Sequence, residues 1–284
     1  MKVLLKIAVQ GGRASFHHLA AQKYFSTGKF NLHSCATFRQ LCEKLLANQV
    51  HYAVMAIENT LVGSILPNYS LLQEYPLHIT GETYLHIEQN LMALPEQSIT
   101  DIHLVRSHPM ALLQCSQFLE QHPQLKSMEA FDTAESAREI RQRQLRGVAA
   151  IASRQAAKLY DLQILARDIE NQKQNYTRFL VLAAQPEANN RCTDKASIHF
   201  RVHDEVGALA RVLNILAEHQ VNLTLIQSIP IPDCPHQYAI HVDVRWQQQA
   251  EFQQALRQIK KISREVKILG LYKSGVKPYD HPGR

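Results

Sequence analysis

The sequence lacks several features that would each have assigned it to a class. No apolar run reaches the roughly 18 residues that a membrane helix needs. The five cysteines are scattered, with no CxxC pair or His/Cys ligand spacing, so neither a disulfide framework nor a zinc site is predicted. The net charge of +6 comes without any run of five basic residues, and no glycine-rich phosphate motif is present. We therefore expect no membrane segment, no metal, no organic cofactor and no nucleic-acid partner.

The residues that are present predict an ordinary globular protein with more than one core. The chain has 284 residues, 45% of them hydrophobic and 20% charged, and this length exceeds the usual single-core size. The opening residues, MKVLLKIAVQGG, are interrupted by Lys6 and lack a small-residue cleavage site, so they predict a strand rather than a signal peptide. A cytoplasmic location is expected.

The first two thirds of the chain alternate strand-like and helix-like patterns, which is typical of an α/β architecture. Pro109 stands at a first helical position, and Asp132 with Glu135 predicts a capping box. The clearest strands are VLLKIAVQ (3–10), HYAVMAI (51–57), VAAIAS (148–153) and TRFLVLAA (177–184).

The remainder of the chain predicts a second, smaller unit. The polar segment QPEANNRCTD suggests a linker over residues 186–194, after a first domain of residues 1–185. Residues 195–275 then read strand, helix, strand, strand, helix, strand, which is a βαββαβ order. Residues 276–284 are expected to form a loose tail.

Polar side chains at strand ends and helix starts are the candidates for chemistry. Glu58 and Asn59 follow a buried strand, at the edge where open α/β sheets bind ligands. Ser107 precedes a helix whose free N–H groups favour an anion, and Gln114 follows two turns later. Arg178 could fork onto a carboxylate. Each residue taken alone also fits a cap, a helix start or a surface ion pair.

Taken together, these segments resemble one enzyme family. ENTLVGSI, SHPMALLQC, DTAESA, AAIAS and NYTRFLVL occur in the order and context of the prephenate dehydratases, followed by a GAL-containing domain similar to ACT domains. The resemblance covers residues 5 to about 272. It implies a catalytic domain folded like a type II periplasmic binding protein, with two α/β lobes around the active site, and an α+β ACT domain.

The resemblance also implies roles for single residues. Prephenate must lose its ring carboxylate as CO2 and its C4 hydroxyl as water, so the enzyme has to help hydroxide leave. Thr177 matches the family's catalytic threonine and is expected to be the general acid, polarised by Arg178. Arg178 and helix N-termini would bind the carboxylates. The expected substrate-binding residues are Asn59, Ser107, Gln114, Glu58 and Ser15.

Three segments depart from the family pattern. Residues 11–17 read GGRASFH where GPEGTFS is usual, so the proline and the second glycine are missing. Val206 stands where proline is common, and Gln227-Ser228-Ile229-Pro230 replaces ESRP. In the family, GAL and ESRP help to form a phenylalanine site between subunits. The predicted effector residues are Gly207, Ala208, Leu209, Gln227 and Ser228, and whether L-phenylalanine still binds them is left open.

Other functions remain open from the sequence alone. An arogenate dehydratase would perform the same elimination and would need an ammonium partner such as Glu58. A binding protein that uses a two-lobe cleft without catalysis is a second alternative, and an amino-acid sensor with an inactive catalytic half is a third. The sequence contains no chorismate mutase or dehydrogenase segment, which predicts a monofunctional enzyme. A homodimer or homotetramer is expected.

Overall fold

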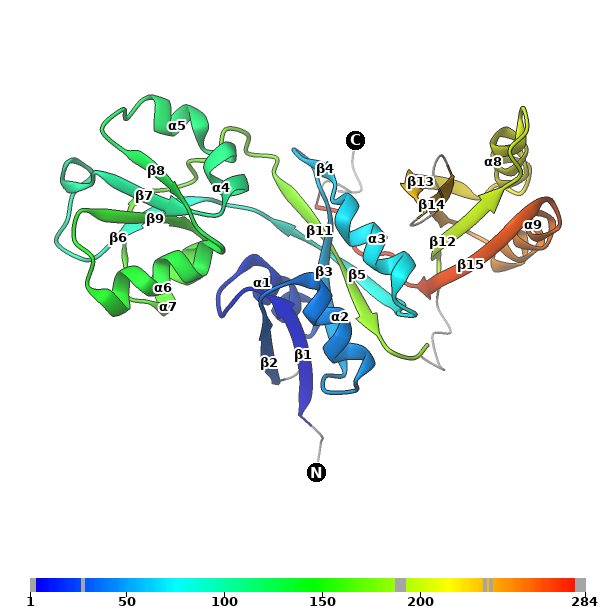
Figure 1. Ribbon diagram of the computed structural model, residues 1–284, viewed down its shortest axis with the longest axis horizontal. Helices are drawn as coiled ribbons and strands as arrows, with labels where there is room; N and C mark the ends of the chain where they lie inside the picture. The colour runs from blue at the N-terminus through cyan, green and yellow to red at the C-terminus, as the bar shows by residue number, and fades with distance from the viewer. Residues whose placement is uncertain (1–3, 27–28, 187–192, 232–233, 235–236, 279–284) are drawn as a thin grey trace.

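The computed structural model describes residues 4–26, 29–186, 193–231, 234 and 237–278. In Figure 1 the chain forms three bodies, each built on its own sheet. The predicted α/β class is confirmed. Most of the expected linker (186–194) and of the expected tail (276–284) lies outside the described residues. No helix among the described residues is long and apolar enough to cross a membrane.

The first lobe is a mixed sheet in the order β2-β1-β3-β11-β5, with β4 paired to β3. β1 runs parallel to β2 and β3, whereas β11 is antiparallel to both of its neighbours, β3 and β5. The elements are β1 (Leu5–Gln10), α1 (Phe16–Tyr24), β2 (Phe30–Cys35), α2 (Phe38–Leu46), β3 (Tyr52–Asn59), β4 (Gly63–Ser64), α3 (Leu66–Glu74), β5 (His78–His86) and β11 (Tyr176–Ala183).

The second lobe is inserted between β5 and β11, and its sheet has the order β10-β6-β9-β7-β8. The chain therefore crosses between the lobes twice, which confirms the expected two-lobe arrangement (Figure 1). The elements are β6 (Asn90–Ala93), η1 (Ile99–Asp101), β7 (Leu104–Ser107), α4 (Pro109–Gln114), α5 (Ser116–Glu120), β8 (Lys126–Glu129), α6 (Thr133–Arg143), β9 (Val148–Ala152), α7 (Arg154–Leu159) and β10 (Gln163–Ala166).

The helix starts predicted for this lobe are present, but two details differ from the prediction. The expected helix after Pro109 divides into α4 and α5 at Cys115. Asp132 caps α6 by accepting from the backbone N–H of Glu135, but the Glu135 side chain pairs with Arg138 instead of completing a capping box.

The C-terminal domain has the predicted βαββαβ order, with a sheet in the order β13-β14-β12-β15. Its helices pack against each other and bury one face of the sheet. The elements are β12 (Lys195–Val202), α8 (Ala208–Glu218), β13 (Asn222–Pro230), β14 (Tyr238–Arg245), α9 (Gln249–Ile262) and β15 (Ser263–Tyr272).

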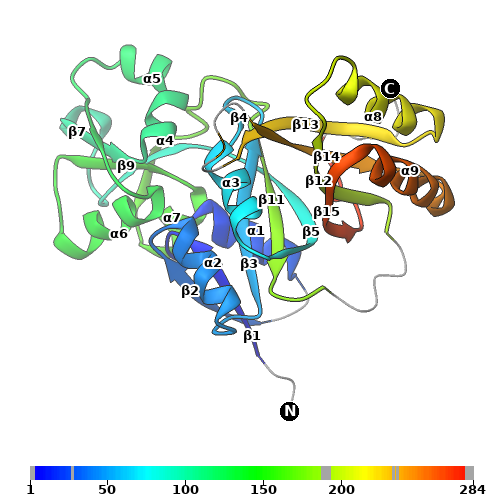
Figure 2. The same cartoon turned by 45° about the vertical axis from the view of Figure 1, so that its right-hand side comes forward.

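The C-terminal domain shares a hydrophobic core with the first lobe rather than hanging from a linker. Leu269 and Tyr272 of β15 are buried in the same cluster as Leu72, Ile79 and Leu180. In Figure 1 α3 lies between β11 and the C-terminal sheet, and Figure 2 shows β15 beside β5, with which it is in contact. The contact is close because Gly270 has no side chain, and an added Cβ would lie 2.1 Å from the carbonyl oxygen of Ile79.

The residues after β15 also contact the first lobe, which corrects the expectation of a loose tail for those that are described. The N–H of Gly275 donates to Glu82 Oε1 at 3.0 Å, and Lys277 lines a pocket together with Glu58 and Tyr84.

Candidate active site

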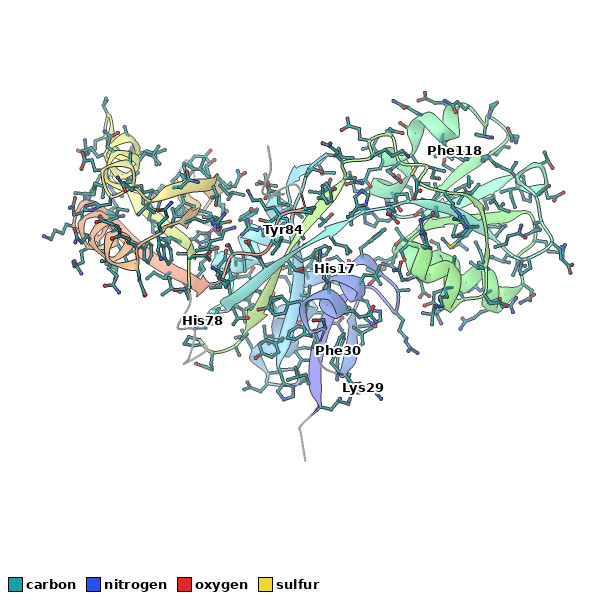
Figure 3. All side chains as sticks on the ribbon, turned by 180° about the vertical axis from the view of Figure 1, so that it is seen from behind. His17, Lys29, Phe30, His78, Tyr84 and Phe118 are labelled. Carbon is teal, nitrogen blue, oxygen red and sulfur yellow. The ribbon has the colours of Figure 1, made fainter. Side chains whose placement is uncertain are left out.

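A cleft of about 600 Å³ lies between the two lobes and is lined by residues from both. Its walls are mainly apolar, and among its described lining residues none is lysine or arginine. Figure 3 labels His17 at the middle of the molecule, where the lobes meet. The lining residues are Gln10, Phe16, His17, Phe38, Ala56, Asn59, Val62, Ser64, Ile65, Leu66, Pro67, Ile87, Gln89, His108, Met110, Ala111, Gln114, Asp132, Thr133, Thr177 and Phe179.

The three titratable side chains of this lining, His17, His108 and Asp132, are shifted toward their neutral forms. Burial, with a smaller contribution from His108, lowers the pKa of His17 to about 3. Burial also lowers the pKa of His108 and raises that of Asp132. Desolvation disfavours the charged form of each of these groups.

Thr177 and Asn59 lie side by side in the cleft because they are partners in the β11–β3 ladder. The Asn59 side-chain N–H donates to Thr177 Oγ1 at 2.9 Å. The amide is oriented by its oxygen, which accepts the backbone N–H groups of Leu61 and Val62. Since the amide nitrogen can only donate, the Thr177 oxygen is the acceptor and its own proton is left for another group.

A row of amides continues from this pair across the floor of the cleft. Asn59 donates to Asn175 Oδ1 at 2.8 Å, and Asn175 donates to Gln114 Oε1 at 3.2 Å. Gln89 donates to the same oxygen of Gln114 at 3.3 Å. With its oxygen engaged twice, Gln114 can offer its N–H groups to a bound molecule. The structure thus brings together three of the predicted residues, Asn59, Gln114 and Thr177.

Arg178 lies on the opposite face of β11, which corrects the expectation that it polarises Thr177 and binds substrate carboxylates. Neighbouring residues of a strand point to opposite faces, so Thr177 and Phe179 line the cleft while Arg178 turns toward the C-terminal domain. Arg178 is 4% exposed and ion-paired there with Glu82 at 2.6 Å and Asp243 at 2.5 Å.

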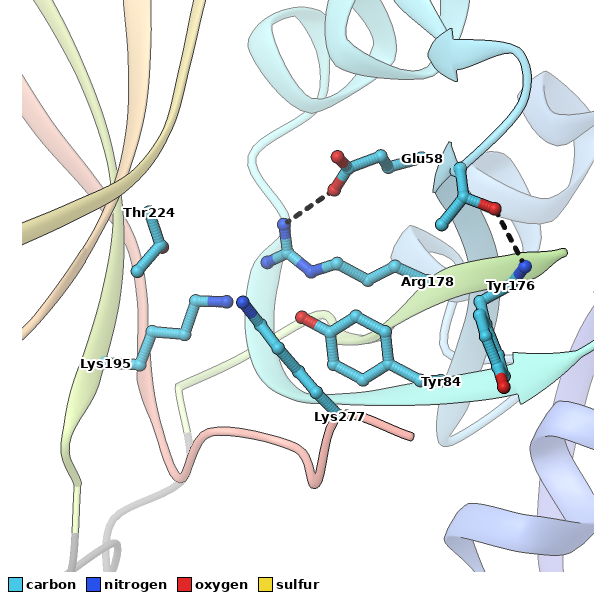
Figure 4. Close-up of a pocket in the computed structure, with 8 residues that line it drawn as sticks. Glu58, Tyr84, Tyr176, Arg178, Lys195, Thr224 and Lys277 are labelled. Carbon is cyan, nitrogen blue, oxygen red and sulfur yellow. Dashed lines mark hydrogen bonds and ion pairs between the residues drawn. The ribbon is translucent and has the colours of Figure 1, made fainter. Parts of the chain in front are cut away.

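Glu58 also lies away from the cleft, for the same reason of alternation. It is the neighbour of Asn59 on β3, and its carboxylate lies 3.9 Å from the Arg178 guanidinium. Figure 4 shows both side chains in a small pocket of about 160 Å³, with Lys195 and Thr224 reaching in from the C-terminal domain. Glu58 is therefore not placed to meet a substrate in the cleft.

The four buried charges at this junction form what we call the seam cluster: Glu82, Arg178, Lys195 and Asp243. Lys195 donates to both carboxylate oxygens of Glu82, at 3.0 and 2.8 Å. Burial is the largest single influence on the pKa of Asp243 and raises it, but Arg178, His241 and Lys195 together hold this pKa well below the usual range. Burial lowers the pKa of Arg178, yet Asp243 and Glu82 keep it well above normal.

Two further predicted binding residues are buried beside the cleft rather than in it. Ser107 is fully buried and donates to the Ile151 carbonyl at 2.6 Å. Its neighbour His108 caps α4 and lines the cleft instead. Ser15 caps α1 by accepting from the His18 N–H at 3.2 Å.

The predicted effector residues occupy two elements of the C-terminal domain. Gly207 precedes α8 with a φ of +78°, a left-handed conformation that suits glycine, and Ala208 and Leu209 begin that helix. Gln227 and Ser228 lie on β13, which is an edge strand of the sheet.

Sequence reasoning missed several residues of the cleft. His108 directly follows Ser107, which the sequence predicts as a binding residue. The pattern around Asp132 predicts only a helix cap. Asn175 is fully buried and not part of the lining, but it joins Asn59 to Gln114 and directly precedes β11. Gln89 and His17 carry no local pattern that would have marked them.

Comparisons with known proteins agree with this arrangement. The prephenate dehydratase family profile matches residues 7–187, and the ACT domain profile matches residues 196–264. A bifunctional chorismate mutase/prephenate dehydratase from Escherichia coli K12 is 34% identical over 97% of this chain and 72% of its own length.

Two solved structures resemble the chain over nearly its whole length. A protein described as a novel type of quorum-quenching acylase, GqqA, has a TM-score of 0.85 at 28% identity, covering 97% of this chain and 100% of its own. A prephenate dehydratase from Arthrobacter aurescens in complex with L-Phe has a TM-score of 0.84 at 24% identity, covering 95% of this chain and 90% of its own.

Proposed function

The chain belongs to the prephenate dehydratase family, and from this premise we propose that it converts prephenate to phenylpyruvate in the cleft between its lobes. The observation that carries the proposal is the Asn59–Thr177 pair, which presents a hydroxyl with an uncommitted proton to a mainly apolar cavity.

Thr177 is proposed as the general acid. As the ring carboxylate leaves as CO2, the electrons of its C–C bond enter the ring and the C4–O bond breaks. The Thr177 proton passes to the departing oxygen to form water, and solvent later restores that proton. The Asn59 N–H, already directed at Thr177 Oγ1, stabilises the negative charge that develops on this oxygen.

The mainly apolar lining of the cleft suits the decarboxylation. A carboxylate bound tightly by a cation would be stabilised before it reacts, which opposes loss of CO2. Among the described lining residues no lysine or arginine is present to do this. The N–H groups of Gln114 offer weaker, neutral hydrogen bonds that can orient the substrate against Thr177.

The direct test is the appearance of phenylpyruvate absorbance from purified protein and prephenate, for the wild type and for Thr177→Ala. We expect turnover by the wild type and a loss of about 100-fold or more in the variant. The matched control is Thr100→Ala, on an exposed turn of the second lobe. Absence of turnover by folded wild-type protein would refute the proposal and would leave a binding or sensing role.

Arogenate is a second possible substrate for the same elimination. Glu58 was the expected ammonium partner, and its position at the seam removes that support. Direct competition between prephenate and arogenate measures the preference, and we expect prephenate to have the higher kcat/KM.

An acylase activity is a second candidate function, favoured by the apolar lining of the cleft and by the similarity to the acylase. In such a reaction water adds to the amide carbonyl, the C–N bond breaks and the amine takes up a proton. The test is the release of octanoate from an N-octanoyl amide. Release that prephenate inhibits would place both activities in one cleft, and no release would remove this function.

The C-terminal ACT domain is proposed to bind L-phenylalanine through Gly207, Ala208, Leu209, Gln227 and Ser228 in a homodimer or homotetramer. The edge position of β13 supports assembly, because its outer hydrogen-bonding groups can pair with another copy. Calorimetry and sizing with L-phenylalanine test this, and no heat with no change in activity at millimolar ligand would reject the effector.

The domain limits and the location are also proposals from the sequence. The limits are residues 1–185, 186–194 and 195–275, and the two profile matches support them. We expect the protein to work in the cytoplasm, which cell fractionation would test.

A further inference from the structure

The seam cluster lies directly behind the proposed catalytic threonine. Arg178 is the next residue along β11 from Thr177, and its guanidinium is held from two sides. Its Nε donates to Glu82 of the first lobe at 2.6 Å, and its Nη1 donates to Asp243 of the ACT domain at 2.5 Å. A planar guanidinium bound at two edges has a fixed orientation. The backbone around Thr177 is therefore anchored partly by a carboxylate of another domain.

Asp243 is itself held in place by its own domain. Its Oδ1 accepts from Ser197 Oγ and lies 3.2 Å from His241 Nε2, and the side chain is fully buried. These contacts leave the carboxylate little freedom to follow movements of Arg178. The position of the ACT sheet thus determines where the guanidinium rests.

β14 reaches the border of the cleft by a second contact. His241, two residues before Asp243 and on the same face of β14, packs edge-on against Tyr69 of α3 with ring centres 4.9 Å apart. The first residues of α3, Leu66 and Pro67, line the cleft. One strand of the ACT domain therefore contacts two elements that shape the site.

We propose that Asp243 is a positioning residue for the dehydratase reaction, acting through Arg178 to hold Thr177 against the substrate. The inference rests on the proposed role of Thr177. If Asp243 only stabilised the fold, its neutral variant would lose stability but keep kcat wherever it stays folded. A positioning role lowers kcat in the folded enzyme, because a small displacement of a catalytic group has a large effect on rate.

The test is steady-state kinetics of full-length Asp243→Asn with prephenate, below the onset of its thermal unfolding. We expect kcat to fall about tenfold and KM to stay within about twofold, since Asp243 does not touch the substrate. The control is Glu265→Gln, another ACT-domain carboxylate, 60% exposed and 3.9 Å from Arg201. It should leave both constants unchanged.

A double-mutant cycle of Asp243→Asn with Arg178→Lys tests whether Asp243 acts on Thr177 through Arg178. Lysine keeps the positive charge but lacks the planar guanidinium that donates to Glu82 and Asp243 together. This variant alone should therefore also lower kcat about tenfold. If Asp243 acts through Arg178, the double variant is no slower than the slower single variant. Should Asp243→Asn fail to fold, Arg178→Lys alone decides, because an unchanged kcat in that variant overturns the proposal.

The outcomes separate this inference from the proposed function. Folded Asp243→Asn with wild-type kcat, alongside an inactive Thr177→Ala, would overturn the positioning role and leave the dehydratase assignment intact. Fully additive effects in the cycle would likewise overturn the route through Arg178. Lack of turnover by the wild type would instead refute the function itself.

Discussion

The two faces of β11 carry different kinds of polar group: hydrogen-bonded hydroxyl and amide groups on the cleft face, and buried ion pairs on the seam face. The cleft side carries Thr177 in a cavity whose titratable groups are all shifted toward neutrality. The seam side, one residue further along, carries Arg178 in a cluster of ion-paired and almost completely buried groups. Neutral hydrogen bonds can orient a substrate without trapping its charge, whereas buried ion pairs hold two domains in a fixed relation. The comparison predicts that seam substitutions lower stability, in addition to the effect on kcat proposed for Asp243 and Arg178, whereas cleft substitutions act mainly on rate.

The largest effect on stability is expected from Glu82→Gln. Glu82 accepts from Arg178, Lys195 and the Gly275 N–H, so its neutralisation leaves buried cations without compensation. We expect a loss of about 3 kcal/mol in the free energy of unfolding, measured by urea denaturation.

Glu74→Gln is the matched control for that measurement. Glu74 forms a two-pronged ion pair with Arg39 on the surface, where both side chains are about half exposed. Removal of this exposed pair should cost far less than removal of Glu82, because solvent and salt screen it. Equal losses in the two variants would contradict the distinction between the seam and the surface.

Asn59→Asp should affect the rate by a comparable free energy. The new carboxylate can only accept, so the Thr177 hydroxyl would turn its proton toward residue 59 and away from the substrate. We expect kcat for prephenate to fall about 100-fold, as for loss of a general acid.

Asn222→Asp, an exposed position on β13, introduces the same charge away from the cleft and should keep the wild-type rate. If Asn59→Asp retained wild-type kcat, Thr177 could not be the proton donor in the way proposed.

Gly270→Ala tests how closely the ACT domain is seated on the first lobe. The added methyl would meet the backbone carbonyl of Ile79, which cannot move away like a flexible side chain. We expect a loss of about 2 kcal/mol in thermal or urea unfolding. Gly12→Ala is the control, because no atom lies within 4 Å of its added Cβ. A tolerated Gly270→Ala would mean that the ACT domain is not tightly packed against the first lobe at this position.

The smallest effect is expected at the rim of the cleft, in the loop that departs from the family pattern. Ala14 occupies the position of the family's second glycine and has a φ of +64°, which is strained for any residue with a Cβ. Ala14→Gly should raise the free energy of unfolding by about 1 kcal/mol, measured by urea denaturation. A decrease would show that the loss of chain entropy outweighs the relief of strain.

The sequence predicted the fold well because its signals are local. Strand-like runs, the βαββαβ order, the helix start at Pro109 and the cap at Asp132 depend on neighbouring residues, and each is present. The family resemblance selected Asn59, Gln114 and Thr177, which the structure brings together.

The errors came from treating residues adjacent in a motif as members of one site. Glu58 and Asn59 are neighbours within β3. Thr177 and Arg178 are neighbours within β11. Because successive side chains of a strand alternate, the two members of each pair point to opposite faces of the sheet. Ser107 and His108 differ in the same way, one buried in the lobe and the other in the cleft.

The sequence by itself determined the family, the order of the elements and the hydroxyl that we propose for catalysis, because these depend on residue type and short-range pattern. Only the tertiary structure decided what lies behind that hydroxyl. Glu82, Lys195 and Asp243 are far apart in the chain and come together around Arg178 when the ACT sheet packs on the first lobe. No local sequence pattern predicts these ion-pair partners, because the partners of a buried charge depend on which surfaces of the folded chain pack against each other.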